Sequence, residues 1–220
     1  MGKASIEAEW LIETPLHLGT GLSRPGYADR IVQKRSDGRA ELNGEAFKSV
    51  VRGAAEQMLR WYATLPEESW DKSYPTHPLL ERLFANSGAV RYRFPMRAAV
   101  GATGQFRAAG TKLELGTGVA ASKTLRLIEN HASQTQFDVR IDASGGDFRA
   151  DSQDLNDLHF LALCLLAGDG VGGKRTSGLG EITCRSLSVT IDGVRAAVTA
   201  EQIDRWIDEF TAAYQEVPTP

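Results

Sequence analysis

Apolar and polar residues alternate along three stretches of the chain, and this pattern predicts β-strands with one buried face. The three stretches cover residues 6–12, 137–141 and 179–191. In the third stretch the alternation changes phase between Cys184 and Leu187, which indicates a β-bulge at that point.

Apolar residues recur every three or four positions in three longer segments, as they do in amphipathic helices. The first segment begins after Asn43, the second covers residues 152–167 and the third covers residues 199–216. Asn43 is suited to cap the first helix, and Asp151 or Ser152 is suited to cap the second.

In a fourth stretch, AVRYRFPMRAAV, apolar and basic residues alternate up to Pro95, which predicts another strand. With it, the main predicted elements follow the order strand–helix–strand and then strand–helix–strand again. This order is typical of the ferredoxin-like, or RRM-like, fold, in which two split β-α-β units share one sheet. We therefore predict an α+β fold with accessory helices. A length of 220 residues suits one substantial core, and no stretch resembles a linker, so we expect residues 1–220 to form a single domain.

The composition excludes several classes of protein. Hydrophobic residues make up 42% of the chain and charged residues 24%, as in ordinary globular proteins. No run of apolar residues is long enough to span a membrane, and the first residues lack the apolar segment of a secretory signal, so we expect a cytoplasmic protein without a membrane partner. Cys164 and Cys184 have neither the spacing of a zinc site nor the number for a disulfide framework.

The charge is distributed unevenly along the chain. The formal net charge of −3 does not indicate a nucleic-acid-binding protein. Residues 91–126, however, hold seven basic residues and one acidic residue, whereas residues 192–216 hold six acidic and two basic residues. The mean charge thus conceals a basic central segment and an acidic terminal one.

Six glycines lie close together in the segment GDGVGGKRTSGLGEI, which begins at Gly168. Gly168, Gly170 and Gly173 match the dinucleotide-binding pattern G-x-G-x-x-G. Gly168, Gly173 and Lys174 match the beginning of a P-loop, but Arg175 stands where that motif requires Ser or Thr.

The order of the neighbouring elements argues against a nucleotide site. Both motifs join a strand to a following helix, whose N-terminus binds the phosphates. Here the predicted helix 152–167 precedes the glycines and the predicted strand 179–191 follows them. A nucleotide-binding enzyme that uses residues 168–175 is therefore a remote alternative. Either the glycines form a helix cap and a turn, or they let the backbone approach an RNA chain whose phosphates Lys174 and Arg175 neutralise.

The segment GVGGKRTSGLGEI resembles the C-terminal glycine-rich loop of the RAMP superfamily of CRISPR–Cas proteins. Other segments resemble, in the same order, the backbone subunit of type III effector complexes. PLHLGTG is similar to the exit of the first strand, GYADRIVQK to a Gly-Ile-Asp loop that keeps Asp29, and LNGEAFKSVVRGAAE to a helix start that keeps Lys48 and Arg52. RLFANS and KTLRLIENHASQTQFDVRI resemble two further elements, and the whole resemblance covers roughly residues 6–191.

This resemblance implies a function as well as a fold. Backbone subunits stack along CRISPR RNA, and an inserted hairpin, the thumb, kinks the guide–target duplex at regular intervals. The candidate thumb is residues 97–118. The counterpart of Asp29 cleaves the target RNA with a divalent metal, which we expect to be Mg²⁺, although the sequence does not identify metal ligands. Arg24 and Arg30 flank Asp29 and are candidates to hold the scissile phosphate, and His17 is a candidate to assist.

The resemblance also implies RNA-binding residues and partners. The candidate RNA-binding residues outside the Asp29 segment are Lys48, Arg52, Gly172, Gly173, Lys174 and Arg175. The expected partners are CRISPR RNA, target RNA, other Cas subunits and copies of this chain or related RAMP subunits.

Two alternatives stay open within this hypothesis. Asp29 lies in a Gly/Pro-containing loop, where an aspartate often forms only a local turn. The chain would then be a non-catalytic structural RAMP subunit of the same complex, an alternative that the altered residues Tyr27 and Ala28 before Asp29 also keep open. Lys48 and Arg52 share one helix face, and solvated surface charge is the usual explanation for such a pair.

Overall fold

The computed structural model describes residues 2–62, 77–85, 88–111, 121–173 and 175–215. Its main sheet has five antiparallel strands in the order β3-β7-β1-β8-β9. These strands are β1 (Gly2–Ile12), β3 (Arg91–Arg93), β7 (Thr135–Gly146), β8 (Ile182–Ile191) and β9 (Val194–Ala197). The four helices are α1 (Gly44–Tyr62), α2 (Pro78–Phe84), α3 (Gln153–Ala167) and α4 (Ala200–Gln215).

The chain order and the strand order together define a ferredoxin-like fold. The first unit is β1–α1–β3 and the second is β7–α3–β8, with β9 added at the edge of the sheet beside β8. The predicted α+β fold with two split β-α-β units is thus confirmed. The predicted bulge is confirmed as well, because Glu9 pairs with Ser186 while the next residue, Trp10, pairs with Cys184.

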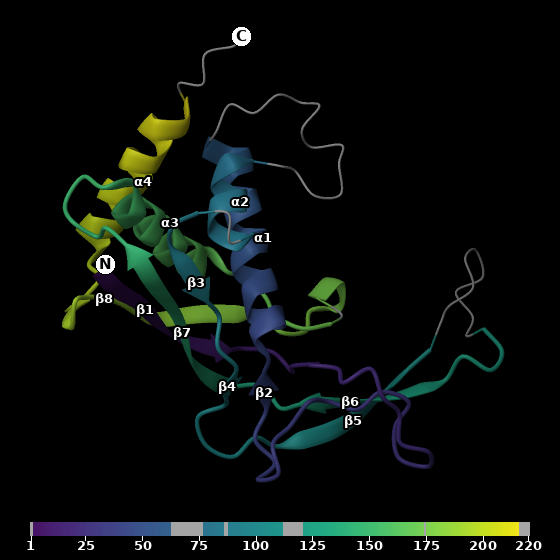
Figure 1. The fold of residues 1–220 in the computed structure, drawn as a ribbon. Helices are drawn as coiled ribbons and strands as arrows, with labels where there is room; N and C mark the ends of the chain where they lie inside the picture. The colour runs from purple at the N-terminus through teal and green to yellow at the C-terminus, as the bar shows by residue number, and fades with distance from the viewer. Residues whose placement is uncertain (1, 63–76, 86–87, 112–120, 174, 216–220) are drawn as a thin grey trace.

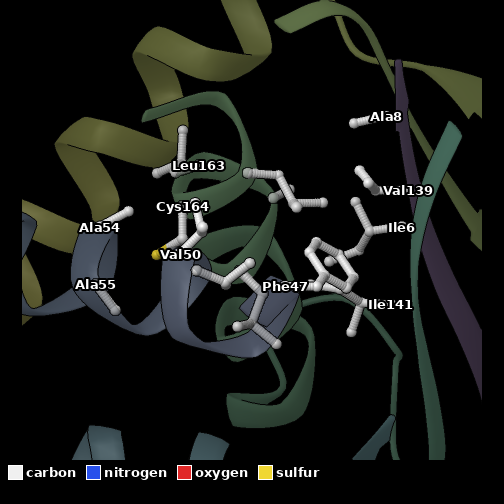
Figure 2. Close-up of a cluster of buried hydrophobic side chains, with 14 of the residues drawn as sticks. Ile6, Ala8, Phe47, Val50, Ala54, Ala55, Val139, Ile141, Leu163 and Cys164 are labelled. Carbon is white, nitrogen blue, oxygen red and sulfur yellow. The ribbon is translucent and has the colours of Figure 1, made fainter. Parts of the chain in front are cut away.

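The core lies between one face of the sheet and the helices α1 and α3 (Figure 2). Ile6 and Ile141 project from the sheet, and Phe47 projects from α1 to meet them. The Phe47 ring also packs edge-on against Trp10, with ring centroids 5.3 Å apart. Because these side chains are completely buried, their apolar periodicity fixes which faces of the strands and helices meet.

Polar caps set the start of the two main helices. The Asn43 side-chain oxygen accepts a hydrogen bond from the backbone N–H of Ala46 at 2.6 Å, as predicted. At α3 the cap is Ser152, whose hydroxyl accepts from the N–H of Leu155 at 3.2 Å. The structure thereby decides between the two predicted caps, Asp151 and Ser152.

The other face of the sheet is polar. On β1 and β7 this face carries Lys3, Ser5, Glu7, Glu9, Leu11, Gln136, Asp138, Arg140, Asp142 and Ser144. Glu7 pairs with Arg140 at 3.0 Å and with Arg195 at 3.2 Å. RRM proteins stack RNA bases on aromatic residues of this face. The central strands of this sheet have none there, so the open face lacks the RRM type of base platform.

A separate β-hairpin extends away from the main sheet and the helices (Figure 1). It consists of β5 (Gln105–Gly110) and β6 (Arg126–His131), which are paired antiparallel. A short pair, β2 (Glu41–Leu42) with β4 (Arg97–Ala98), lies at its base.

The predicted thumb boundaries differ from this hairpin. The range 97–118 includes β4 and β5 but stops before β6, and its residues 112–118 lie outside the described part of the chain. The sequence pattern does not predict the second strand, β6, because Glu129, Asn130 and His131 are polar yet buried and β6 therefore has no clean apolar alternation.

The core contacts of Phe47 lead to a prediction for stability. Phe47→Ala should lower the free energy of unfolding by about 3–5 kcal/mol, because it removes a buried ring and leaves a cavity. Trp61, on the same helix, is 65% exposed, so Trp61→Ala should change the value by less than about 0.5 kcal/mol. Urea denaturation followed by circular dichroism measures both, and equal losses would contradict this description of the core.

Candidate nucleic-acid interface

The segment that contains Asp29 folds back on itself and attaches to the hairpin. We call residues 19–34 the Asp29 loop. Gly19 pairs with Val32, and Arg24 pairs with Ala28, which makes the loop a narrow antiparallel turn. Arg30 forms a parallel bridge with Ile128, so the loop extends the β5–β6 pair at its β6 edge.

Asp29 is exposed and held by β6. Its N–H donates to the carbonyl of Leu127 at 2.8 Å, and its carboxylate Oδ2 accepts from the Leu127 N–H at 2.7 Å. This bond links residues that are 98 positions apart, so the carboxylate forms a tertiary contact and not merely a local turn. The contact orients a carboxylate at the surface of the hairpin.

Three arginines accompany Asp29. Arg24 and Arg107 both lie against the ring of Tyr27, with guanidinium carbons 5.3 Å and 4.9 Å from its centroid. Arg107 also donates to the carbonyl of Tyr27 at 3.3 Å. Arg30 is exposed next to Asp29. The structure therefore adds Arg107, from β5, to the two predicted arginines of the loop, and the ring keeps two of these cations in place.

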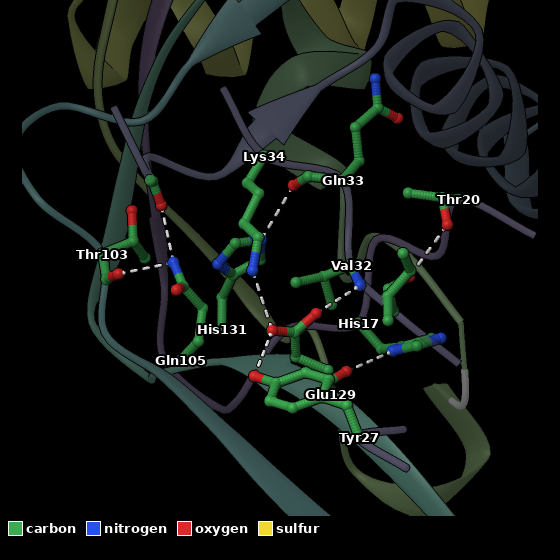
Figure 3. Close-up of polar contacts among 12 residues, drawn as sticks. His17, Thr20, Tyr27, Val32, Gln33, Lys34, Thr103, Gln105, Glu129 and His131 are labelled. Atoms are coloured by element: carbon green, nitrogen blue, oxygen red, sulfur yellow. Dashed lines mark hydrogen bonds and ion pairs between the residues drawn. The ribbon is translucent and has the colours of Figure 1, made fainter. Parts of the chain in front are cut away.

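Glu129 lies beneath the loop and is completely buried (Figure 3). Its carboxylate accepts hydrogen bonds from the Tyr27 hydroxyl at 2.9 Å, from the Lys34 ammonium at 2.9 Å and from the Val32 N–H at 3.1 Å. Burial by itself raises the pKa of Glu129, but these donors outweigh it and leave the pKa below its ordinary value. Glu129 is therefore an ionised, fully hydrogen-bonded group.

His17 connects this cluster to the glycine-rich loop. It is buried, and its Nδ1 lies 2.8 Å from the carbonyl oxygen of Glu129, to which it donates. On the other side, its own carbonyl accepts from the N–H of Gly173 at 2.8 Å. His17, the candidate to assist Asp29, therefore bonds to the backbone of β6, and the described residues show no hydrogen bond between His17 and Asp29.

The glycine-rich loop, residues 168–181, packs against the exit of β1. At Gly172 a side chain would meet the carbonyl of His17, and at Gly180 it would overlap the carbonyl of Val171. Gly172 and Gly180 also have φ angles of +86° and +73°, a region that favours glycine. Close backbone packing within the protein therefore explains these two glycines without a ligand.

The same loop follows the C-terminal end of α3 and precedes β8, as the sequence predicted. No long helix begins in the described part of this loop, so that part lacks the N-terminus that a P-loop or a dinucleotide loop uses for phosphate. Arg175 is exposed and forms an ion pair with Asp169. Lys174 lies outside the described residues.

Lys48 and Arg52, both on α1, each bond to another part of the protein. The Lys48 ammonium donates to the carbonyl of Phe84, the last residue of α2, at 2.7 Å. Arg52 pairs with Glu56 one turn later at 2.8 Å. The start of α1 adjoins the Asp29 loop, because Asn43 donates to the side chain of Gln33 at 3.2 Å.

A protein-family model described as the RAMP superfamily matches residues 12–183, which include the Asp29 loop, both hairpin strands and the glycine-rich loop. The chain belongs to the RAMP superfamily. It is thus a CRISPR-associated RNA-binding protein whose partners are RNA and other Cas proteins. The comparison with curated proteins gives no match.

Two further properties of this RAMP protein concern metal binding and membrane spans. Among the described residues, no group of three or more His, Cys, Asp or Glu side chains is placed to hold a metal ion. Mg²⁺ is commonly held by one or two carboxylates together with waters and substrate phosphate oxygens. No helix in the described ranges is long and apolar enough to cross a membrane.

Tyr27, Glu129 and Arg107 are the site residues that the sequence did not assign to the cluster. Tyr27 stands where the Gly-Ile-Asp pattern of the family has another residue, and Arg107 is one of the seven basic residues between positions 91 and 126, which the sequence does not place beside the Asp29 loop. Glu129 had no signal of its own, because a single acidic residue in a strand is ordinary.

The glycine-rich loop of this RAMP protein offers a matched pair of substitutions. Gly178 and Gly180 have nearly the same φ, +75° and +73°, but only Gly180 has protein atoms where a side chain would lie. Gly178→Ala should cost about 1–2 kcal/mol of unfolding free energy for the left-handed backbone alone. Gly180→Ala should cost clearly more, because its methyl group overlaps Val171. Urea denaturation compares the two, and equal costs would show that the close approach is unimportant.

Proposed function

We propose that this RAMP protein is the backbone subunit of a type III CRISPR–Cas effector complex, in which it binds CRISPR RNA and cleaves the paired target RNA at regular intervals. One observation carries the proposal. An exposed carboxylate, that of Asp29, is fixed to the edge of a projecting hairpin and is accompanied by arginines from the loop and the hairpin. Such a site suits a phosphodiester substrate, because the cations attract the phosphates while the carboxylate stays accessible.

The hairpin has the surface expected of an element that contacts bases. In the part of the hairpin that the structure describes, the exposed large apolar residues are Phe106, Leu125 and Leu127, and the neighbouring loop adds Leu22. Basic residues Arg107, Lys123 and Arg126 alternate with them along the hairpin. Apolar groups that contact base faces and cations that contact phosphates are the combination found in single-strand-binding surfaces. We assign the thumb role to β5–β6, and with it the kink between successive segments of the duplex.

The proposed reaction uses the 2′-hydroxyl of the target RNA. Its oxygen forms a bond to phosphorus, the bond from phosphorus to the 5′-oxygen breaks, and the leaving oxygen gains a proton while the hydroxyl loses one. The kink would place the 2′-oxygen in line with the leaving group, and this alignment supplies a large part of the rate. Asp29 with RNA phosphates would hold Mg²⁺, which supplies Lewis-acid stabilisation of the charge on phosphorus.

A non-catalytic structural RAMP subunit is the second candidate function. It is favoured by the bond between the Asp29 carboxylate and the Leu127 N–H, since a carboxylate that only attaches the loop to β6 would make the same contact. In both candidates the chain assembles with copies of itself or with related RAMP subunits along CRISPR RNA.

The two candidates differ in the behaviour of Asp29→Asn. Asparagine keeps a side-chain oxygen that accepts from Leu127 but loses the negative charge. If Asp29 is catalytic, the assembled complex with Asp29→Asn should retain its target affinity and lose at least about 100-fold in single-turnover cleavage, a size typical of losing one such group. Asp29→Ala should be equally inactive. Cleavage by Asp29→Asn at the wild-type rate would leave the structural candidate.

RNA binding by the arginines is tested separately. The double variant Arg24→Gln with Arg107→Gln should bind single-stranded RNA more weakly, and its affinity should depend less on salt. The slope of log K against log salt should become less negative by roughly 0.7 for each lost phosphate contact. Arg149→Gln is the matched control, because Arg149 is 86% exposed and lies beyond the opposite end of β7. Fluorescence anisotropy at several salt concentrations measures the slopes, and identical slopes in both variants would refute the assignment.

A further inference from the structure

Glu129 is connected to both sides of Asp29. Tyr27, two positions before Asp29, and Val32 and Lys34, after it, all donate to the Glu129 carboxylate (Figure 3). The three donors belong to a loop more than 90 positions away in the sequence. The carboxylate therefore closes the loop at its base, with Asp29 between the attached points.

The backbone of the same strand holds Asp29 itself. Leu127, two positions before Glu129 on β6, makes two hydrogen bonds with Asp29, and the N–H of Glu129 donates to the carbonyl of Arg30 at 2.9 Å. The backbone groups of residues two apart on a strand point to the same edge, so Leu127 and Glu129 both bond to the loop along this edge of β6. The position of Asp29 relative to the hairpin is thereby set by β6.

The attachment of the loop depends on the buried charge of Glu129, so a single substitution that removes this charge weakens it. A buried carboxylate with three donors is stable, but loss of its charge leaves the Lys34 ammonium without its partner and weakens the other two bonds. Lys34 is the more exposed member of the pair, with 38% of its side chain accessible, so it can return to water when the pair is broken. The loop would then detach at its base while the core remains folded.

We propose that Glu129 is the positioning residue of the Asp29 loop: its buried carboxylate, bonded to Tyr27, Val32 and Lys34, fixes where Asp29 stands against the hairpin. Glu129 does not touch RNA in this proposal, and it acts only through the loop. Its effect on cleavage rests on the function proposed above for Asp29, but its effect on the loop does not.

The first experiment measures the loop in the isolated full chain. Hydrogen–deuterium exchange with mass spectrometry compares wild type, Glu129→Gln and the control Glu56→Gln, which weakens an ion pair on α1 instead. In Glu129→Gln, exchange in residues 19–34 should become at least about 10-fold faster, while peptides from α3 and β1 keep their protection. In Glu56→Gln the loop should exchange as in wild type.

The second experiment measures cleavage by the assembled complex. Glu129→Gln should slow single-turnover cleavage of target RNA at least about 10-fold, with the dissociation constant for target unchanged within about twofold. A residue that only supports the fold would change binding and assembly together with the rate. Tyr27→Phe removes one donor without disturbing the charge pair, so it should show the same pattern to a smaller extent. In the Glu129→Gln background it should add nothing.

The outcomes separate this proposal from the one on which it rests. Unchanged exchange in residues 19–34 overturns the positioning role, whatever the cleavage result. Faster exchange with an unchanged cleavage rate also overturns it, because the loop then moves without consequence. If the wild-type complex does not cleave, the function proposed for Asp29 fails, and the exchange data alone decide whether Glu129 holds the loop. If Glu129→Gln exposes the whole core, Tyr27→Phe decides in the same two assays.

Discussion

The rest of the site depends on the backbone hydrogen bonds of the short segment that follows β1. Residues 13–17 continue the chain beyond the central strand and form backbone hydrogen bonds on both sides. On one side Glu13 and Pro15 bond to Glu181 and Gly180, the last two residues of the glycine-rich loop, at 2.9 Å each. On the other side Leu16 bonds in both directions to His131 at the end of β6. Because the central strand is fixed by two full-length neighbours, this short segment brings the glycine-rich loop and the hairpin into one place.

Two carboxylates of this site have opposite environments. Glu129 is completely buried and surrounded by donors, whereas Asp29 is exposed and bonded to one backbone N–H. A buried, satisfied charge stabilises one arrangement of its neighbours, since any movement leaves donors unpaired. An exposed carboxylate remains accessible to cations and substrate. The arrangement therefore attaches the loop through the first carboxylate and keeps the second at the surface.

The ferredoxin-like sheet serves here as a scaffold. In RRM proteins the open face of such a sheet stacks bases on aromatic residues. The central strands β1 and β7 carry acidic, basic and small polar residues on that face, and the ion pairs of Glu7 with Arg140 and Arg195 lie across it. On the hairpin and the Asp29 loop, by contrast, exposed apolar residues such as Phe106 and Leu22 occur together with the cations of Arg24 and Arg107. A shared fold thus does not decide where RNA binds, because the site depends on the side chains that the loops add.

The sequence by itself determined the main elements of the core and their order. Alternation in β1, β7 and β8 and the helical spacing in α1 and α3 are local patterns, and burial of one face enforces them, so the ferredoxin-like core and the bulge beside Cys184 could be predicted. The motif around Asp29 and the glycine-rich loop indicated the superfamily for the same reason, since each lies within a short stretch. Only the tertiary structure decided that Glu129 reaches Tyr27, that Arg107 joins Arg24, and that Lys48 caps the end of α2. These contacts join residues 36 to 102 positions apart, and a buried polar residue has no periodic signal that would mark its partner.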